Sequence, residues 1–187
     1  LCGRIFFEKL GFVKKSKILG IAIGTHGVTD ASKGIVLVSP HNPIWGKNLA
    51  FADLVKKALS PRCPVEIDNQ IRYQAMAESL IGLEGKYRNI IVLRSGLGSI
   101  AGIIEGNTVK RGKHLLSGHI GHITLDPNEE ETCFCGGKGC FEQLVSITRL
   151  VKKAKSYKKR YPSSGIFSDC KIEDLSADRI FKEANNN

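Results

Sequence analysis

Three of the six cysteines in this 187-residue chain lie within the segment Cys-Phe-Cys-Gly-Gly-Lys-Gly-Cys, which runs from 133 to 140. Cysteine thiolates are the ligands that structural zinc prefers. The glycines between them allow the tight backbone turns that a small chelate needs. The spacing predicts a structural zinc loop here. The alternative is three reduced thiols in a loop without metal.

Tetrahedral zinc needs a fourth ligand, and histidine is the usual partner of cysteine in such sites. His122 lies shortly before Cys133 in the sequence. The competing candidates are His26, His41, His114 and His119. Spacing alone leaves the choice among these five histidines open.

The composition is that of a globular protein, with 42% hydrophobic and 25% charged residues. No apolar run reaches the roughly 18 residues that a membrane span needs. The first residues lack the long apolar stretch of a secretory signal. We therefore expect a cytoplasmic protein with no membrane partner, whose cysteines stay reduced.

Short apolar runs alternate with segments of helical periodicity along the chain. The runs predict strands over residues 18–23, 35–38, 65–67, 89–93, 100–104 and 120–125. The periodic segments predict helices over about 49–59, 71–83, 141–155 and 176–184, with Asn48 as the cap of the first. This order of strands and helices indicates an α/β protein.

The net charge of +10 is unevenly distributed. Residues 143–168 contain seven basic side chains and no acidic one. A solvated basic face is the ordinary interpretation of such a segment, and a polyanion site is the alternative. The segment shows no evident aromatic stacking platform and no zinc-finger spacing, so a nucleic-acid partner has no further support from the sequence.

Four segments carry a resemblance to a known family. Residues 118–122 read Gly-His-Ile-Gly-His, and residues 133–142 read Cys-Phe-Cys-Gly-Gly-Lys-Gly-Cys-Phe-Glu. Together they resemble the hallmark of the ROK family, Gly-Glu-x-Gly-His followed by Cys-x-Cys-Gly-x-x-Gly-Cys-x-Glu. Residues 20–30 and 39–45 are similar to two further loops of this family. The ROK family joins bacterial sugar kinases and sugar-responsive transcriptional repressors.

The resemblance implies an α/β fold of the actin-like ATPase or RNase H-like sugar-kinase type. Residues 1–68 would form part of the first lobe. Residues 69–187 would form the second lobe, with the zinc loop at about 118–142. The family pattern also selects the zinc ligands among the candidates above, as His122, Cys133, Cys135 and Cys140.

The chain departs from the kinases of the family at the catalytic base. Their base is the Asp of a Glu-Asn-Asp motif, and residues 68–70 here read Asp-Asn-Gln. Gln70 therefore takes the base position, although Asp68 is an alternative alignment. A carboxamide cannot accept a proton from a sugar hydroxyl at neutral pH. The kinases' first phosphate loop, Asp-x-Gly-Gly-Thr, does not occur in these residues, and Arg94 replaces the first glycine of the second loop. We expect no catalytic residues and no enzymatic activity.

The family's sugar-contacting positions fall on five residues of this chain: Asn69, Gln70, His119, His122 and Glu142. Gln70 and His119 replace carboxylates. Charge-assisted hydrogen bonds are about twice as strong as neutral ones, so the resemblance implies a weakened sugar pocket. Polar residues that contact no ligand are the alternative for each position.

The expected function is that of a non-catalytic ROK-type transcriptional regulator, with this chain as its effector-binding and dimerisation region. DNA would be bound through a winged-helix domain that is not present in this chain. A second hypothesis is a regulator that acts by protein contact on another repressor, like the anti-repressor linked to staphylococcal methicillin resistance in the xylose-repressor branch. A sugar kinase is the third.

Overall fold

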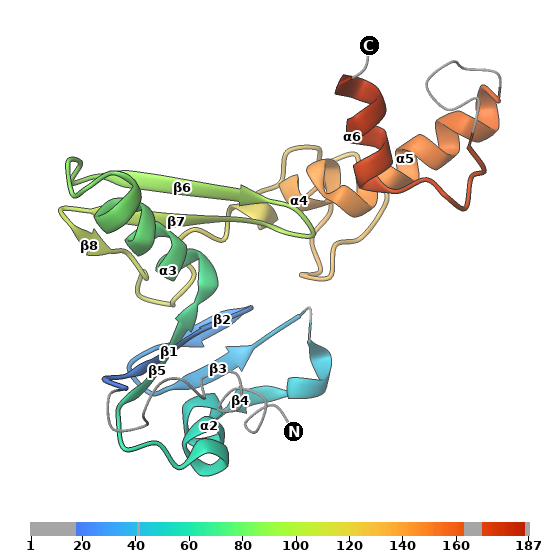
Figure 1. Cartoon of the computed structure of the whole chain (residues 1–187). Coiled ribbons are helices and arrows are strands. Elements are labelled where there is room, and N and C mark those ends of the chain that lie inside the picture. The colour runs from blue at the N-terminus through green and yellow to red at the C-terminus, as the bar shows by residue number, and fades with distance from the viewer. Residues whose placement is uncertain (1–17, 41, 163–169, 186–187) are drawn as a thin grey trace. The chain divides into compact units, whose positions relative to one another are not determined.

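The computed structural model describes residues 18–40, 42–162 and 170–185, which form two compact units (Figure 1). Unit 1 extends to residue 92 and includes residues 101–118. Unit 2 comprises residues 93–100 and the chain from residue 119 onward. The division into lobes at residue 68 stays a prediction. Of the histidines considered above, His41 lies outside the described residues.

Unit 1 is built around a parallel pair of strands, β1 (Ile21–Thr25) and β5 (Val65–Asn69). Their register runs from Ile21 opposite Val65 to Thr25 opposite Asn69. Three further strands, β2 (Val28–Asp30), β3 (Ile35–Val38) and β4 (Lys47–Leu49), form an antiparallel sheet. Because β1 and β5 are parallel, the residues that follow both strands meet at one edge.

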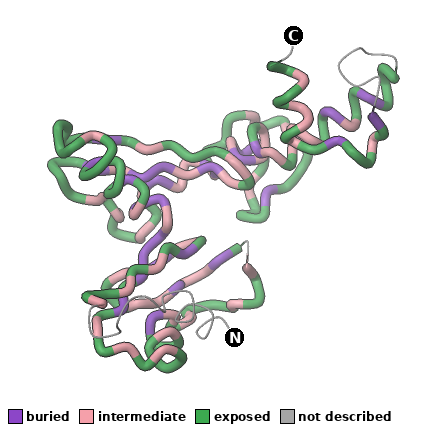
Figure 2. The backbone as a smooth tube through the Cα atoms, in the orientation of Figure 1, coloured by how far each residue is buried: buried purple, intermediate pink, exposed green. Residues whose placement is uncertain are grey.

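Two helices of unit 1 pack against these strands. Helix α2 (Phe51–Leu59) follows the short 3-10 helix η2 (Pro43–Trp45), and its Ala52 contributes to a core with Val36 and Ile67. Helix α3 (Gln70–Ala77) begins directly after β5 and continues into a π-helical turn, η3 (Glu78–Gly82). Figure 2 shows the buried residues of β5 continuing into the first turn of α3.

The predicted helix cap at Asn48 is wrong. Asn48 lies in β4 with a φ of 56°, and α2 begins after Ala50, which has no side chain able to cap. Asparagine tolerates this left-handed conformation better than most residues. Asn48 therefore belongs to the strand before α2 and does not cap the start of that helix.

A third sheet contains β6 (Ile90–Ser95), β7 (Ser99–Glu105) and β8 (Thr108–Val109) in that order. In unit 1, Ala75 of α3 packs with Ile90 and Ile104 in a second core cluster. Gly102 of β7 lies at the point where α3 packs against this strand. A Cβ atom there would stand 2.5 Å from the carbonyl oxygen of Ile71.

Unit 2 contains the 3-10 helix η4 (Ile120–His122) and three α-helices, α4 (Phe141–Val145), α5 (Ile147–Arg160) and α6 (Ala177–Asn185). The predicted strand over 120–125 is therefore wrong: only an isolated bridge from Thr124 to Cys140 has strand pairing there. The single predicted helix over 141–155 is two helices. Ser146 has extended backbone dihedrals and caps α5 through its hydroxyl oxygen, which accepts the Arg149 N–H at 3.2 Å. Within the described residues, no helix combines the length and the apolar character that a membrane crossing requires.

We predict that Gly102→Ala destabilises the protein by about 1–3 kcal/mol, because the added methyl group overpacks the contact between α3 and β7. Urea unfolding measures the effect. Gly96→Ala is the matched control, since a Cβ there meets nothing within 4 Å. Equal stability of the two variants would contradict close packing of α3 on Gly102.

Candidate metal centre and effector-site residues

Four potential metal ligands converge in unit 2. They are His122, Cys133, Cys135 and Cys140, and their ligand atoms all lie within 4.8 Å of one another. The Cys133 sulfur is 3.7 Å from Nδ1 of His122, and the Cys135 and Cys140 sulfurs are 3.6 Å apart. Cys133 and Cys140 are buried, whereas Cys135 is exposed. The cluster thus has one side open to solvent.

The backbone of the cysteine loop positions these sulfurs. The Cys133 N–H donates to the Gly137 carbonyl at 2.7 Å, and the Gly136 N–H donates back to the Cys133 carbonyl at 2.8 Å. Gly139 has a φ of 62°, and a Cβ there would lie 1.6 Å from the carbonyl oxygen of Asp126. Only glycine permits this approach, which brings Cys140 back toward the first two cysteines.

The distances and the donor types fit a tetrahedral zinc ion. Zinc–sulfur bonds of about 2.3 Å place sulfur ligands about 3.8 Å apart in a tetrahedron, close to the 3.6 Å between the Cys135 and Cys140 sulfurs. The N–H of Gly137, which donates to Cys135, lowers the pKa of that thiol. Burial raises the pKa of the Cys140 thiol to about 12. A divalent cation would oppose this increase, because metal binding favours the thiolate form.

The remaining histidines lie outside this cluster in the part of the chain that is described. Nδ1 of His26 is 3.2 Å from the side-chain nitrogen of Gln70, in unit 1. His114 is exposed in the loop after β8, and His119 immediately precedes η4. Geometry therefore favours His122 among the histidines left open by the spacing.

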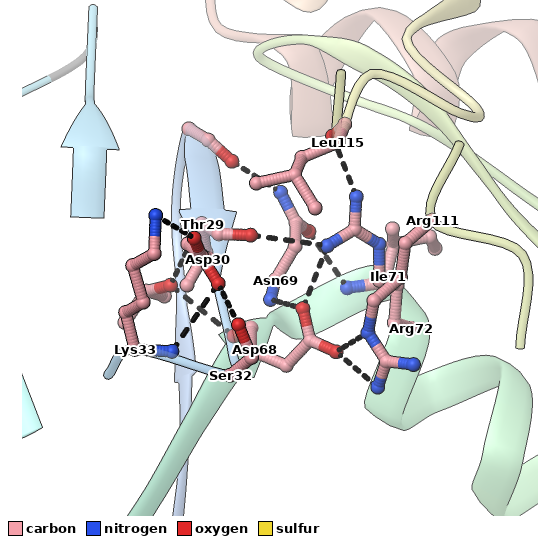
Figure 3. A network of polar contacts seen from close by, with 12 residues as sticks. Thr29, Asp30, Ser32, Lys33, Asp68, Asn69, Ile71, Arg72, Arg111 and Leu115 are labelled. Carbon is pink, nitrogen blue, oxygen red and sulfur yellow. Dashed lines mark hydrogen bonds and ion pairs between the residues drawn. The ribbon is translucent and has the colours of Figure 1, made fainter. Parts of the chain in front are cut away.

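A buried ion network surrounds the start of α3 in unit 1 (Figure 3). Asp68, at 1% relative exposure, receives Nη1 of Arg72 at 2.7 Å on one carboxylate oxygen. Its other oxygen receives Nε and Nη2 of Arg111 at 2.9 and 2.8 Å. Arg72 also donates to the carbonyl oxygens of Thr29 and Leu115. Both oxygens of Asp68 are therefore engaged by guanidinium groups.

This network is not among the sequence predictions, in which Asp68 appears only as an alternative base and Arg72 and Arg111 have no role. The spacing of Asp68 and Arg72 by four residues was an available indication, because such residues can pair across a helix start. The contribution of Arg111 depends on tertiary folding and had no local sign.

Asn69 and Gln70 lie together at the edge where β1 and β5 end. The Asn69 side chain accepts the Ile71 N–H at 3.0 Å, as the cap of α3, and donates to the Gly27 carbonyl at 2.7 Å. Gln70 is the first residue of α3 and is half-buried beside His26. The Asn69 side chain is thus engaged in hydrogen bonds within the fold, and the Gln70 amide is the more accessible of the two side chains.

The other three predicted contact residues belong to unit 2. His119 lies two residues before Gly121, and His122 directly follows it. A Cβ at Gly121 would lie 3.0 Å from a carboxylate oxygen of Glu142. That oxygen accepts the backbone N–H of Ser99 at 2.9 Å, and Glu142 is buried. Glu142 therefore links α4 to the turn between β6 and β7.

The turn between β6 and β7 contains the residues that the resemblance aligns with the second phosphate loop of the kinases. Arg94 is exposed at the end of β6, and the Gly96 N–H donates to the Gly98 carbonyl at 2.9 Å. The Gly96 carbonyl accepts the Ile147 N–H at the start of α5. The amide of Gly96 is thus occupied within the turn.

The sequence profile of the ROK family matches residues 11–187. This chain belongs to the ROK family. It is 32% identical over 167 residues to the xylose repressor of Caldicellulosiruptor bescii, covering 89% of this chain and 41% of that protein. It is 27% identical over 147 residues to the glucokinase of Thermotoga maritima, covering 79% of this chain and 45% of the relative. The chain spans less than half the length of these relatives.

Solved structures of the ROK family share its fold. A ROK transcriptional regulator, a homologue of the E. coli MLC protein, superposes with a TM-score of 0.74 at 28% identity over 98% of this chain and 46% of that one. The ROK glucokinase of Streptomyces griseus, in complex with glucose and AMPPNP, gives 0.78 at 26% identity over 91% and 55%. The expected α/β fold of actin-like sugar kinases is confirmed.

We predict that Arg72→Met destabilises the ROK chain by about 3–5 kcal/mol, because it leaves the buried Asp68 carboxylate short of a partner. Urea unfolding measures this change. Lys56→Met is the control, since it removes an ion pair whose two side chains are more than half exposed and should cost less than about 1 kcal/mol. A similar small effect for both variants would show that Arg72 does not stabilise the fold through Asp68.

Proposed function

We propose that this chain is the effector-binding and dimerisation region of a non-catalytic ROK transcriptional regulator. The observation that carries the proposal is Gln70 at the position of the kinase base. The neutral amide cannot take a proton from a sugar hydroxyl. Asp68, the alternative base, is buried between two guanidinium groups. No carboxylate at residues 68–70 is available to act as the base.

The relatives include repressors and glucokinases, so similarity alone does not choose between regulator and kinase. The altered phosphate loop supports the regulator. Phosphoryl transfer depends on positioning and on charge stabilisation by backbone amides. Here the Gly96 amide is occupied within its turn, and Arg94 adds bulk before it. DNA binding would use a winged-helix domain outside these residues, and the regulator would act as a homodimer.

We further infer that His122, Cys133, Cys135 and Cys140 bind a structural zinc ion. The ion would add to the hydrogen bonds that hold the cysteine loop, because its binding free energy becomes folding free energy when the ligands come from separate segments. Cys140 directly precedes α4, and His122 ends η4. The zinc loop would therefore hold the two segments that carry His122 and Glu142.

We predict about one zinc ion per chain in freshly purified protein, and its loss in Cys133→Ser, because three remaining ligands bind zinc much more weakly. Elemental analysis after dialysis measures the metal content. Cys63→Ser is the matched control, since Cys63 lies in unit 1, outside the cluster. Equal zinc in the two variants, or none in the parent, would contradict the zinc site.

We also propose Asn69, Gln70, His119, His122 and Glu142 as the effector-contacting residues. Gln70 and His119 can still hydrogen-bond hydroxyl groups, but both lack the negative charge of a carboxylate. The expected effector is a monosaccharide or related polyol, bound weakly. Asn69 would act mainly through the fold, because its side chain is engaged by Ile71 and Gly27.

We predict that Gln70→Asp combined with His119→Glu tightens monosaccharide binding by about tenfold or more, because each charge-assisted hydrogen bond contributes about 1.5–3 kcal/mol. Calorimetry with glucose, xylose and N-acetylglucosamine measures the affinity. The control is Gln74→Asp with His114→Glu, which makes the same changes at exposed positions of unit 1.

The outcome separates sugar sensing from the other candidate functions. Tighter binding by the first double variant alone supports the effector residues. No heat from parent or variants, with folding intact, favours a regulator that acts by contact with another repressor protein. Sugar-dependent release of ADP from ATP by the unmodified protein would overturn the non-catalytic assignment.

A further inference from the structure

Helix α5 of unit 2 concentrates positive charge. Its fourteen residues include seven basic ones and no acidic one. These residues are Arg149, Lys152, Lys153, Lys155, Lys158, Lys159 and Arg160. Cations in the last turn complement the helix dipole, but those in the middle of the helix need another explanation.

Among the described residues, carboxylates pair with two cations in the first half of α5. Arg149 pairs with Glu129 and Glu131, and Lys152 pairs with Glu131. The Lys158 side chain is buried and donates to the Pro162 carbonyl. Four cations have no ion pair within residues 18–40, 42–162 and 170–185: Lys153, Lys155, Lys159 and Arg160.

Part of this charge lines an open hollow of about 450 Å³. Lys152, Lys155 and Lys159 lie along it at spacings of three and four residues, and so share one helix face. Thr148 and Ser156 add hydroxyl groups to the same lining. Among the described residues, the lining therefore presents ammonium and hydroxyl donors, and one of these ammonium groups, that of Lys152, is paired with Glu131.

Two aromatic side chains border the basic residues. The rings of Tyr157 and Tyr161 stack with centroids 6.4 Å apart, and both residues are exposed. The Arg160 guanidinium lies 5.6 Å from the centre of the Tyr161 ring. The prediction that this segment has no aromatic platform is therefore wrong. The helical spacing of four residues brings the two rings together.

We propose that this face of α5 binds the phosphate backbone of double-stranded DNA without reading its sequence. Phosphate oxygens are contacted in such complexes by lysine, serine and threonine side chains among others, and the lining of the hollow offers all three. The inference goes beyond the proposed function, which placed DNA contact only outside these residues. Residues of this chain would then contact DNA directly, in addition to the DNA-binding domain outside it.

The apolar residues of α5 argue against a lipid surface. Ala154 is buried, and Leu150 and Val151 are half-buried. A helix that lies in a membrane interface instead exposes a continuous apolar face. The exposed positions of α5 are mainly cations and hydroxyl-bearing side chains.

The test is fluorescence anisotropy of this chain with a labelled DNA duplex of about 25 base pairs and arbitrary sequence, between about 50 and 200 mM NaCl. We expect binding that weakens as salt rises. The variant Lys152→Gln, Lys155→Gln, Lys159→Gln removes the three lysines that line the hollow. It should bind about tenfold more weakly or worse, with a salt slope lower by about 2–3, because fewer phosphate contacts release fewer counterions.

The matched control removes three positive charges from exposed positions of unit 1, as Lys47→Gln, Lys57→Gln, Lys113→Gln. It should bind DNA nearly as the parent does, and circular dichroism should show both variants folded. If the two variants lost DNA affinity equally, binding would depend on net charge and not on α5, and the proposal would be overturned. Absence of salt-dependent DNA binding by the parent, or tighter binding to phosphatidylserine vesicles at the same salt, would also overturn it.

Discussion

The carboxylate of Asp68 is removed from water and held between Arg72 and Arg111, and the start of α3 depends on this arrangement. A buried charge is costly unless its partners are in place. Arg72 meets that need and also donates to Thr29 and Leu115, so one side chain connects β5, β2 and the loop after β8 within unit 1. The residue that follows Asn69 is thereby fixed at the edge of the parallel strands. In this chain that residue is Gln70, an amide that the resemblance aligns with the base of the family's kinases.

In unit 2 the comparable constraint is the cysteine loop. The approach of Gly139 to Asp126 brings Cys140 into the cluster, and α4 begins at the next residue. Glu142 in that helix accepts the Ser99 N–H, so the loop, α4 and the turn between β6 and β7 are joined through a few contacts. A metal ion would connect the same segments through His122.

The sequence predicted the elements whose pattern is local. The strand over 35–38 and the parallel strand ending at Asn69 follow from apolar runs, and the cysteine cluster follows from spacing. The strand expected over 120–125 failed because its apolar residues belong to a loop held by Gly121 and Cys140, a tertiary effect. Arg111 was missed for the same reason. Ser146 was missed as a helix break, although serine before a helical segment is a favourable cap.

The polar groups at the end of β5 and on α5 are those on which the two proposals for this chain rest. A base for phosphoryl transfer would need an available carboxylate at the end of β5, but the carboxylate of Asp68 is neutralised by two arginines and its neighbour is an amide. This is the argument for the proposed regulator over a kinase. On α5, Lys155 and Lys159 have no ion pair within the described residues, and they lie with Thr148 and Ser156 along one hollow. Ammonium and hydroxyl donors in that arrangement are what the proposed contact with DNA phosphates requires.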